Sequence, residues 1–325
     1  MKNQRKKKLS FLWKVFESIV PQILKKLISA LTTPILCAYT PQNKKGVQMT
    51  RITFQGALGA YSHIACTELF PNAEYIPSDT FEEALELVDE KQADFAVIPV
   101  ENSNAGRVSD VHFLLPKTDL TIRAEHFLRV EHQLLALPEA KLENIKTAQS
   151  HPQALAQCSK YLKKHNIKPI SRIDTAKSCE QITATKDLTT AAIASKLAAE
   201  IYKMQILAAN IENDSNNTTR FLIMSKDKTL IEDDGSNFIT SLVFKVKNIP
   251  AALYKALGGF ATNNINLTKI ESYMATGNFA STQFYVEIES HPSRKEFCLA
   301  LEELKFYSES IHFLGTYKAS PKRSL

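Results

Sequence analysis

The chain has 325 residues, enough for two or three domains of ordinary size, and its formal net charge is +6. Residues 1–48 hold ten basic side chains and one acidic one, so this segment is strongly positive while the rest of the chain is slightly negative. This charge distribution excludes a basic nucleic-acid-binding surface as the function of the body of the chain. The five cysteines are scattered and form no CxxC pair, which favours buried reduced thiols over a disulfide framework or a zinc site.

The basic segment at residues 1–48 has the pattern of an amphipathic helix, with apolar residues at helical spacing and an interruption at Pro21. Three interpretations stay open: a helix on an anionic membrane surface, a targeting segment, or sequence upstream of a true start at Met49. Met49 directly precedes the first predicted strand, so a start there would lose no structural element. A transmembrane helix is disfavoured, because the uncharged run is short and contains prolines.

Predicted strands and helices alternate from residue 51 to about residue 225, which is typical of an open α/β sheet with helices on both faces. The predicted strands are apolar or β-branched runs at residues 51–54, 93–100, 145–149, 169–173, 191–194, 205–211 and 219–225. The predicted helices cover residues 61–70, 152–164 and 195–202, and two more begin after caps at Asp79-Thr80 and at Thr175. In such sheets, ligands bind at the carboxyl ends of the strands.

Four polar clusters stand at the ends of these strands. They are Gly56, Gly59 and Ser62, then residues 101–106, then residues 150–153, and finally residues 217–221. Converging hydroxyls, amides and helix N-terminal N–H groups suit a small anion with one or two carboxylates, and Arg220 could make a bidentate contact with one of them. Each cluster alone has an ordinary explanation as a turn, a cap or a strand residue, but four together favour a ligand site. A dinucleotide site is disfavoured, because Tyr61 stands where its fingerprint needs a glycine.

The C-terminal part of the chain has a different order of elements. Residues 227–237 are polar and charged, as in a linker. Beyond them we predict strand 238–246, helix 251–263, strands 265–272 and 279–288, helix 294–307 and strand 311–317. This βαββαβ order predicts a ferredoxin-like domain over residues 238–318, followed by a tail at residues 319–325.

Four motifs match, in order and spacing, those of the prephenate dehydratase family, which the chain resembles over roughly residues 51–318. They are Gly56–Ser62, Pro99–Ser103, Ser150–Leu155 and Asn217–Phe221. The resemblance implies that residues 49–226 form a catalytic domain of two α/β lobes, like a periplasmic binding protein, with the active site in the cleft between them. The implied reaction is loss of water and carbon dioxide from prephenate to give phenylpyruvate, in phenylalanine biosynthesis.

The resemblance also implies domain boundaries and residue roles. Lobe 1 would comprise about residues 51–128 and 215–226, and lobe 2 about residues 129–212. The family's essential threonine maps onto Thr219, whose weakly acidic hydroxyl is better suited to donating a hydrogen bond to the leaving oxygen than a free proton; Glu101 or His151 would supply or relay the proton. The candidate substrate contacts are Ser62, Asn102, Ser103, Gln153 and Arg220. Aromatisation drives the fragmentation, so the reaction requires neither a cofactor nor a metal.

Residues 238–318 resemble an ACT regulatory domain, through Pro250–Leu253, Asn266–Ser272 and Leu314–Tyr317. Such domains bind phenylalanine at a dimer interface and inhibit the enzyme, which implies a homodimer or homotetramer. The candidate residues for phenylalanine are Ala251, Leu253, Asn266, Glu271 and Ser272. The chain departs from the family at Ala251, where glycine is frequent, and at Tyr273-Met274, where Arg-Pro is frequent. A domain that only mediates dimerisation is the alternative.

Two other functions compete with the leading hypothesis. An arogenate dehydratase performs the same chemistry on the amino analogue of prephenate, and the sequence does not discriminate between the two substrates. A solute-binding or amino-acid-sensing protein could use the same two-lobed fold, but it would not need intact motifs at residues 101–103 and 219–221. Because prephenate is an intracellular metabolite, we expect a cytoplasmic protein, unless the extension is a real targeting peptide.

Overall fold

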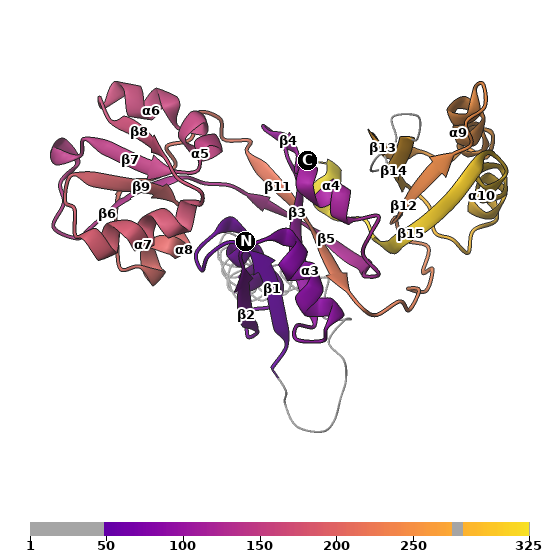
Figure 1. Cartoon of the computed structure of the whole chain (residues 1–325), viewed down its shortest axis with the longest axis horizontal. Helices are drawn as coiled ribbons and strands as arrows, with labels where there is room; N and C mark the ends of the chain where they lie inside the picture. Colours follow the sequence, from indigo (N-terminus) through magenta and orange to yellow (C-terminus); the bar gives the residue numbers. More distant parts are fainter. Residues whose placement is uncertain (1–48, 275–281, 325) are drawn as a thin grey trace, which may run out of the picture. The chain divides into compact units, whose positions relative to one another are not determined.

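The computed structural model describes residues 49–274 and 282–324. The expectations for residues 1–48, for the start of the strand at 279–288 and for the last residue of the tail lie outside the described residues. Within the described part, three sheets organise the chain (Figure 1). No helix in these two ranges is both long and apolar enough to span a bilayer.

The first sheet has the strand order β2-β1-β3-β11-β5, and the short strand β4 pairs with β3. Its strands are β1 (Arg51–Gln55), β2 (Glu74–Ser78), β3 (Phe95–Asn102), β4 (Gly106–Arg107), β5 (Thr121–Arg129) and β11 (Thr218–Ser225). Its helices are α2 (Tyr61–Leu69), α3 (Phe81–Asp89) and α4 (Ser109–Leu114). Strand β11 comes from much later in the chain and lies antiparallel between β3 and β5.

The second sheet has the order β10-β6-β9-β7-β8. Its strands are β6 (Gln133–Ala136), β7 (Thr147–Ser150), β8 (Lys168–Ser171), β9 (Thr190–Ala194) and β10 (Gln205–Ala208). Its helices are α5 (Pro152–Gln157), α6 (Ser159–Lys164), α7 (Thr175–Thr185) and α8 (Lys196–Ile201), with a 3₁₀ turn at Leu142–Asn144. Small and apolar side chains from β7 and β9 fill the core beneath α5 and α6.

Two crossing segments, residues 130–132 and 209–217, connect the first two sheets. They lie side by side: the Val130 N–H donates to the Asn217 carbonyl at 2.8 Å, and the Ile211 N–H donates to the His132 carbonyl at 2.9 Å. On the other side, the Ser195 hydroxyl donates to the Gly59 carbonyl at 2.6 Å. Residues at the crossing are therefore held by backbone hydrogen bonds, in reach of both sheets.

The third sheet is entirely antiparallel, in the order β13-β14-β12-β15. Its elements are β12 (Phe238–Val246), α9 (Ala252–Thr262), β13 (Leu267–Met274), β14 (Thr282–Ile288), α10 (Lys295–Tyr307) and β15 (Ser308–Lys318), followed by a 3₁₀ turn at Pro321–Ser324. The βαββαβ order is as predicted. Phe244, Phe260 and Phe297 join one apolar cluster, because α9 and α10 cover one face of the sheet (Figure 1).

Several local predictions need correction. The helix predicted from residue 152 to residue 164 is two helices, since Cys158 leaves helical geometry with φ −107° and ψ 10°. The cap of α7 is Asp174, whose carboxylate accepts the Lys177 N–H at 2.8 Å, and Thr175 is already the first helical residue. At α3 the predicted cap is confirmed: the Thr80 hydroxyl accepts the Glu83 N–H at 3.1 Å.

The sequence patterns missed strands β2, β5 and β6. Strand β5 buries Arg123 and Glu125, so charged residues occupy positions where the pattern needs apolar ones. Strand β2 lies at a sheet edge and contains Pro77, which removes a ladder donor and weakens a strand prediction. Among the described cysteines, Cys66, Cys158 and Cys179 are buried and Cys298 is exposed.

Candidate active site

Strand alternation places two adjacent motif residues of β11 on opposite faces of the first sheet. In the register of β3 and β11, Thr219 lies opposite Asn102 and Arg220 lies opposite Glu101. Because successive side chains in a strand point to opposite faces, the Thr219–Asn102 pair and the Arg220–Glu101 pair face different surroundings.

Asn102 holds the Thr219 hydroxyl. Its Nδ2 donates to Thr219 Oγ1 at 3.0 Å and to Asn217 Oδ1 at 2.8 Å. Its Oδ1 accepts the backbone N–H groups of Asn104 and Ala105, at 3.1 and 3.0 Å. These four contacts fix the amide plane of Asn102. Since the Thr219 oxygen already accepts a hydrogen bond, the hydroxyl proton is the part of the group that can be offered to a ligand.

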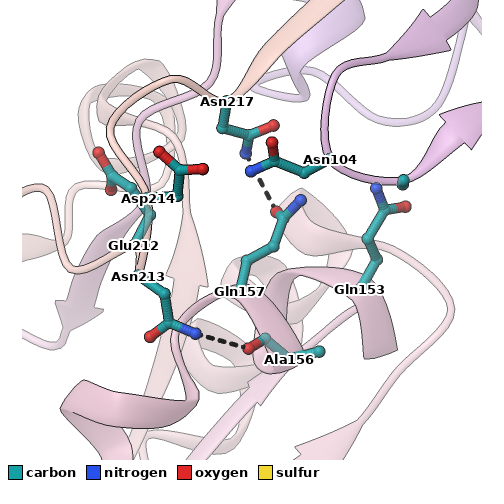
Figure 2. Close-up of a pocket in the computed structure, with 9 residues that line it drawn as sticks. Asn104, Gln153, Ala156, Gln157, Glu212, Asn213, Asp214 and Asn217 are labelled. Carbon is teal, nitrogen blue, oxygen red and sulfur yellow. Dashed lines mark hydrogen bonds between the residues drawn. The ribbon is translucent and has the colours of Figure 1, made fainter.

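A pocket of about 310 Å³ lies beside this pair. Its lining combines side chains of the β3–β4 turn, of α5 and of the returning crossing segment: Asn104, Ala105, Gln153, Ala156, Gln157, Glu212, Asn213, Asp214 and Asn217 (Figure 2). Thr219 is joined to this lining through Asn102 and Asn217. The pocket therefore presents mostly amide groups, with two carboxylates at one side.

A chain of hydrogen bonds runs from Asn217 through Gln157 to residues behind the pocket. Asn217 Nδ2 donates to Gln157 Oε1 at 3.1 Å, and His132 Nε2 lies 2.8 Å from the same oxygen. On its other side, His132 Nδ1 lies 2.7 Å from the Tyr61 hydroxyl. Desolvation by burial lowers the pKa of His132 and raises the pKa of Tyr61, so both side chains are neutral at neutral pH.

The other predicted residues on this side differ in their surroundings. Gln153 lines the pocket. The Ser103 hydroxyl donates to the Asn216 carbonyl at 2.9 Å and accepts the Thr218 N–H at 3.0 Å, which ties β3 to β11. His151 is exposed and caps α5, its Nδ1 accepting the Gln153 N–H at 3.3 Å. Ser62 is buried in the first turn of α2. Neither His151 nor Ser62 lines the pocket.

Arg220 and Glu101 face the third sheet, and the roles expected for them in substrate binding and proton transfer stay predictions. The Arg220 guanidinium is buried and contacts the carboxylates of Glu125 and Glu287 at 2.8 and 2.6 Å. Glu101 lies 2.8 Å from Lys269 Nζ in β13 and 3.9 Å from Arg220. Both side chains thus have charged partners within the protein.

Sequence reasoning passed over Gln157, His132 and the acidic residues of the crossing segment as site residues. Gln157 had a signal: it stands four residues after Gln153, so both amides fall on one face of α5. His132 had none, because a single histidine between two strands is compatible with any environment. Glu212 and Asp214 reach the pocket only because the crossing segments run together.

The candidate regulatory residues belong to α9 and β13. Ala251 precedes α9 with a left-handed φ of 61°, a conformation that favours glycine, and Leu253 lies in the first turn of the helix. Asn266 Nδ2 donates to Glu289 at 2.8 Å. Glu271 lies 3.0 Å from Arg107 of β4, and Ser272 is exposed.

Metal binding has no support among the residues that the structure describes. Within residues 49–274 and 282–324, no three histidine, cysteine, aspartate or glutamate side chains gather closely enough to hold a metal ion.

Comparison with known proteins gives a consistent result. The family model for prephenate dehydratase matches residues 52–229. A bifunctional N-acyl-homoserine lactone acylase/prephenate dehydratase of Komagataeibacter europaeus is 43% identical over 84% of this chain and 97% of its own length. Arogenate dehydratase/prephenate dehydratase 1 of Arabidopsis thaliana, a chloroplastic protein, is 38% identical over 82% of this chain and 71% of its own length.

A solved structure extends the likeness to the third sheet. The prephenate dehydratase of Arthrobacter aurescens, in complex with L-Phe, is 28% identical, with a TM-score of 0.78 over 84% of this chain and 91% of that one. The family match covers more than half of the chain, and the match to the Komagataeibacter relative covers 84% of this chain and 97% of that protein. The chain therefore belongs to the prephenate dehydratase family.

Proposed function

We propose that this protein converts prephenate to phenylpyruvate, water and carbon dioxide, in the biosynthesis of phenylalanine. The observation that carries the proposal is the Thr219 hydroxyl, oriented by Asn102 beside an amide-lined pocket. Membership of the family supports this reaction, and the contact between Asn102 and Thr219 supports Thr219 as the group that acts at the leaving oxygen. We place the reaction in the cytoplasm, where an intracellular metabolite would be met.

The chemistry divides into binding and assisted departure. The amides of Asn104, Gln153 and Gln157 can donate hydrogen bonds to the carboxylates of the substrate. Thr219 donates a hydrogen bond to the 4-hydroxyl oxygen as the C–O bond breaks. The ring carboxylate leaves as carbon dioxide, the electron pair of its bond to the ring completes the aromatic system, and the departing hydroxide takes up a proton from solvent to become water. Hydrogen bonds that strengthen as charge develops on the leaving oxygen lower the barrier.

Arogenate is a second candidate substrate, and one observation favours it. Glu212 and Asp214 line one side of the pocket, and no lysine or arginine is among the described lining residues. A carboxylate at this position attracts the ammonium group that arogenate carries and prephenate lacks. The substrate assay therefore compares the two compounds on the same preparation.

The C-terminal domain over residues 238–318 is proposed to be an ACT domain that binds phenylalanine and inhibits the enzyme. Its βαββαβ sheet and the complex of the Arthrobacter relative with L-Phe support this assignment. The proposed contacts are Ala251, Leu253, Asn266, Glu271 and Ser272. The proposed assembly is a homodimer or homotetramer formed through this domain, and residues 227–237 would act as the linker to it.

The test is phenylpyruvate formation by the full chain from prephenate, alongside consumption of arogenate, with and without millimolar phenylalanine. Thr219→Val keeps the side-chain volume and removes the hydroxyl, and we expect turnover to fall at least about a hundredfold. Thr218→Val is the matched control, because its side chain belongs to the other face of β11 and should leave turnover unchanged.

Three results would count against the proposal. Near-normal activity of a folded Thr219→Val variant would remove Thr219 from the mechanism. No turnover of either substrate by the wild-type chain would remove the enzyme assignment. The same preparations are assayed with an N-acyl-homoserine lactone, because the name of the Komagataeibacter relative includes that acylase activity; hydrolysis of this compound with no turnover of prephenate would replace the proposed reaction.

A further inference from the structure

His132 is a buried histidine that lies behind the pocket. It precedes β6 on the outgoing crossing segment, and only 2% of its surface is exposed. Its backbone N–H donates to Glu212 Oε2 at 3.0 Å, and its ring lies between the Tyr61 hydroxyl and Gln157 Oε1. The ring thus contacts Gln157, which lines the pocket, but His132 is not part of the lining.

The partners of the ring determine where its proton lies. Gln157 Oε1 can only accept, so His132 Nε2 carries the hydrogen that it donates at 2.8 Å. In a neutral imidazole the other nitrogen is then an acceptor, and Nδ1 accepts the Tyr61 hydroxyl proton at 2.7 Å, a proton that Tyr61 shares with the Glu131 carbonyl at 3.0 Å. Tyr61 comes from the first turn of α2, so this short chain connects elements of the first and second sheets.

The Gln157 amide is oriented by two donors on one oxygen. Asn217 Nδ2 and His132 Nε2 both donate to Oε1, at 3.1 and 2.8 Å. The amide nitrogen of Gln157 consequently points away from Asn217 (Figure 2). With only one donor on Oε1, rotation of the amide by half a turn would put an acceptor where a donor now stands. For an anionic ligand, that exchange replaces attraction with repulsion.

We propose that His132 is a positioning residue of the active site. It holds the Gln157 amide so that Nε2 of Gln157 is presented to the substrate and Asn217 stays aligned with the Asn102–Thr219 pair. This inference rests on the proposed function, because the effect of His132 on turnover is measured in the proposed reaction. The role is distinct from filling space, because an apolar side chain of the same size would fill the cavity and leave Gln157 Oε1 with one donor.

The experiment separates donation from packing with two substitutions in the full chain. His132→Met replaces the ring with an unbranched side chain of similar size and removes the donor. His132→Gln offers an amide N–H near the position of Nε2. We expect kcat of His132→Met to fall about tenfold to a hundredfold with KM changed less than about threefold, because a misoriented group loses more in the transition state than in binding. His132→Gln should recover most of kcat.

The matched control is His126→Met. His126 lies on β5 and pairs at 2.9 Å with Glu68, which is not part of the pocket lining, so kcat should stay at the wild-type level. Thermal unfolding is measured for all three variants. Equal losses of kcat in His132→Met and His132→Gln, at similar loss of thermal stability, would show that the site needs the imidazole for packing alone and would overturn the proposal.

A second measurement is independent of turnover. In ¹⁵N-labelled wild-type protein, the ring nitrogens of His132 should show a proton on Nε2 and none on Nδ1 at neutral pH. A proton on Nδ1 with a bare Nε2 would overturn the proposal whether or not the chain turns over prephenate. If the wild-type chain is inactive on both substrates while this tautomer is found, the proposed function fails and the orientation of Gln157 by His132 stands.

Discussion

Replacement of Glu287 by glutamine should weaken the fold by about 3 kcal/mol, because this carboxylate joins the first and third sheets from a buried position. Glu287 is 1% exposed. Its two oxygens lie 2.6 Å from Arg220 and 2.6 Å from Arg323, and the Tyr285 hydroxyl donates to it at 2.7 Å. Glutamine retains the shape of the side chain and some of its hydrogen bonds but removes the charge that both guanidinium groups face.

The magnitude follows from the ionisation of Glu287. Burial alone would raise the pKa of its carboxyl group, but Arg220 and Arg323 outweigh burial and lower the pKa from 4.5 to about 2. A shift of that size corresponds to about 3 kcal/mol of preference for the ionised form in the folded state. Removal of one partner from a buried ion pair typically destabilises by about 3–5 kcal/mol, which agrees.

The assay is urea unfolding at pH 7, followed by far-ultraviolet circular dichroism. Glu289→Gln is the control, since this glutamate stands two residues along on the same chain segment, is exposed, and should change stability by less than about 0.5 kcal/mol. A loss below about 1 kcal/mol for Glu287→Gln, or one equal to that of the control, would refute the reasoning.

The pH dependence has a definite sign. Because the folded pKa of Glu287 lies below the unfolded one, its contribution is fully present above about pH 4.5 and is lost as the pH falls toward 2. The stability difference between the wild type and Glu287→Gln should therefore narrow below pH 4.5. A difference that stays constant down to the acid limit of folding would mean that the charge is not the source of the stabilisation.

Three further predictions concern the contacts around the site. Gly59→Ala should destabilise the fold by about 2 kcal/mol or more, because φ is +90° and the new Cβ would lie 2.8 Å from Ala198 Cα. Gly258 has open space around it, so Gly258→Ala should not destabilise the fold, and equal melting temperatures of the two variants would contradict this. Arg107→Gln should raise the phenylalanine concentration for half-inhibition, since it removes the 3.0 Å ion pair with Glu271. An unchanged inhibition curve would show that this ion pair does not carry the inhibition. Removal of residues 1–48 should leave kcat unchanged, because the first described strand begins at Arg51; an inactive or insoluble product would show that the segment is needed.

Several features could be predicted from sequence because they depend on neighbours along the chain. Thr80 caps α3, as its residue type before an apolar helical run indicates. The βαββαβ order of residues 238–318 follows from the change between strand and helix periodicity. The polar ends of β3 and β11 were recognised as candidate site elements because hydroxyl and amide residues stand at the end of β3 and at the start of β11.

Other features depend on which strands become neighbours. Strand β5 escaped recognition because Arg123 and Glu125 are buried among partners that lie far away in the sequence. The surroundings of Arg220 could not be assigned either. Because side chains alternate along a strand, Arg220 and Thr219 point to opposite faces of the sheet, but only the packing of the third sheet against β5 and β11 decides which face meets the pocket.

The sequence by itself determined the family, most of the order of the elements, and the choice of Thr219 and Asn102 as candidate site residues, because these depend on residue types and their spacing. Only the tertiary structure decided that β11 lies between β3 and β5, that Asn102 therefore holds Thr219, and that His132 and Gln157 join the same hydrogen-bond network. The physical reason is that strand pairing and side-chain hydrogen bonds between distant segments depend on the packing of the whole domain, which no local pattern encodes.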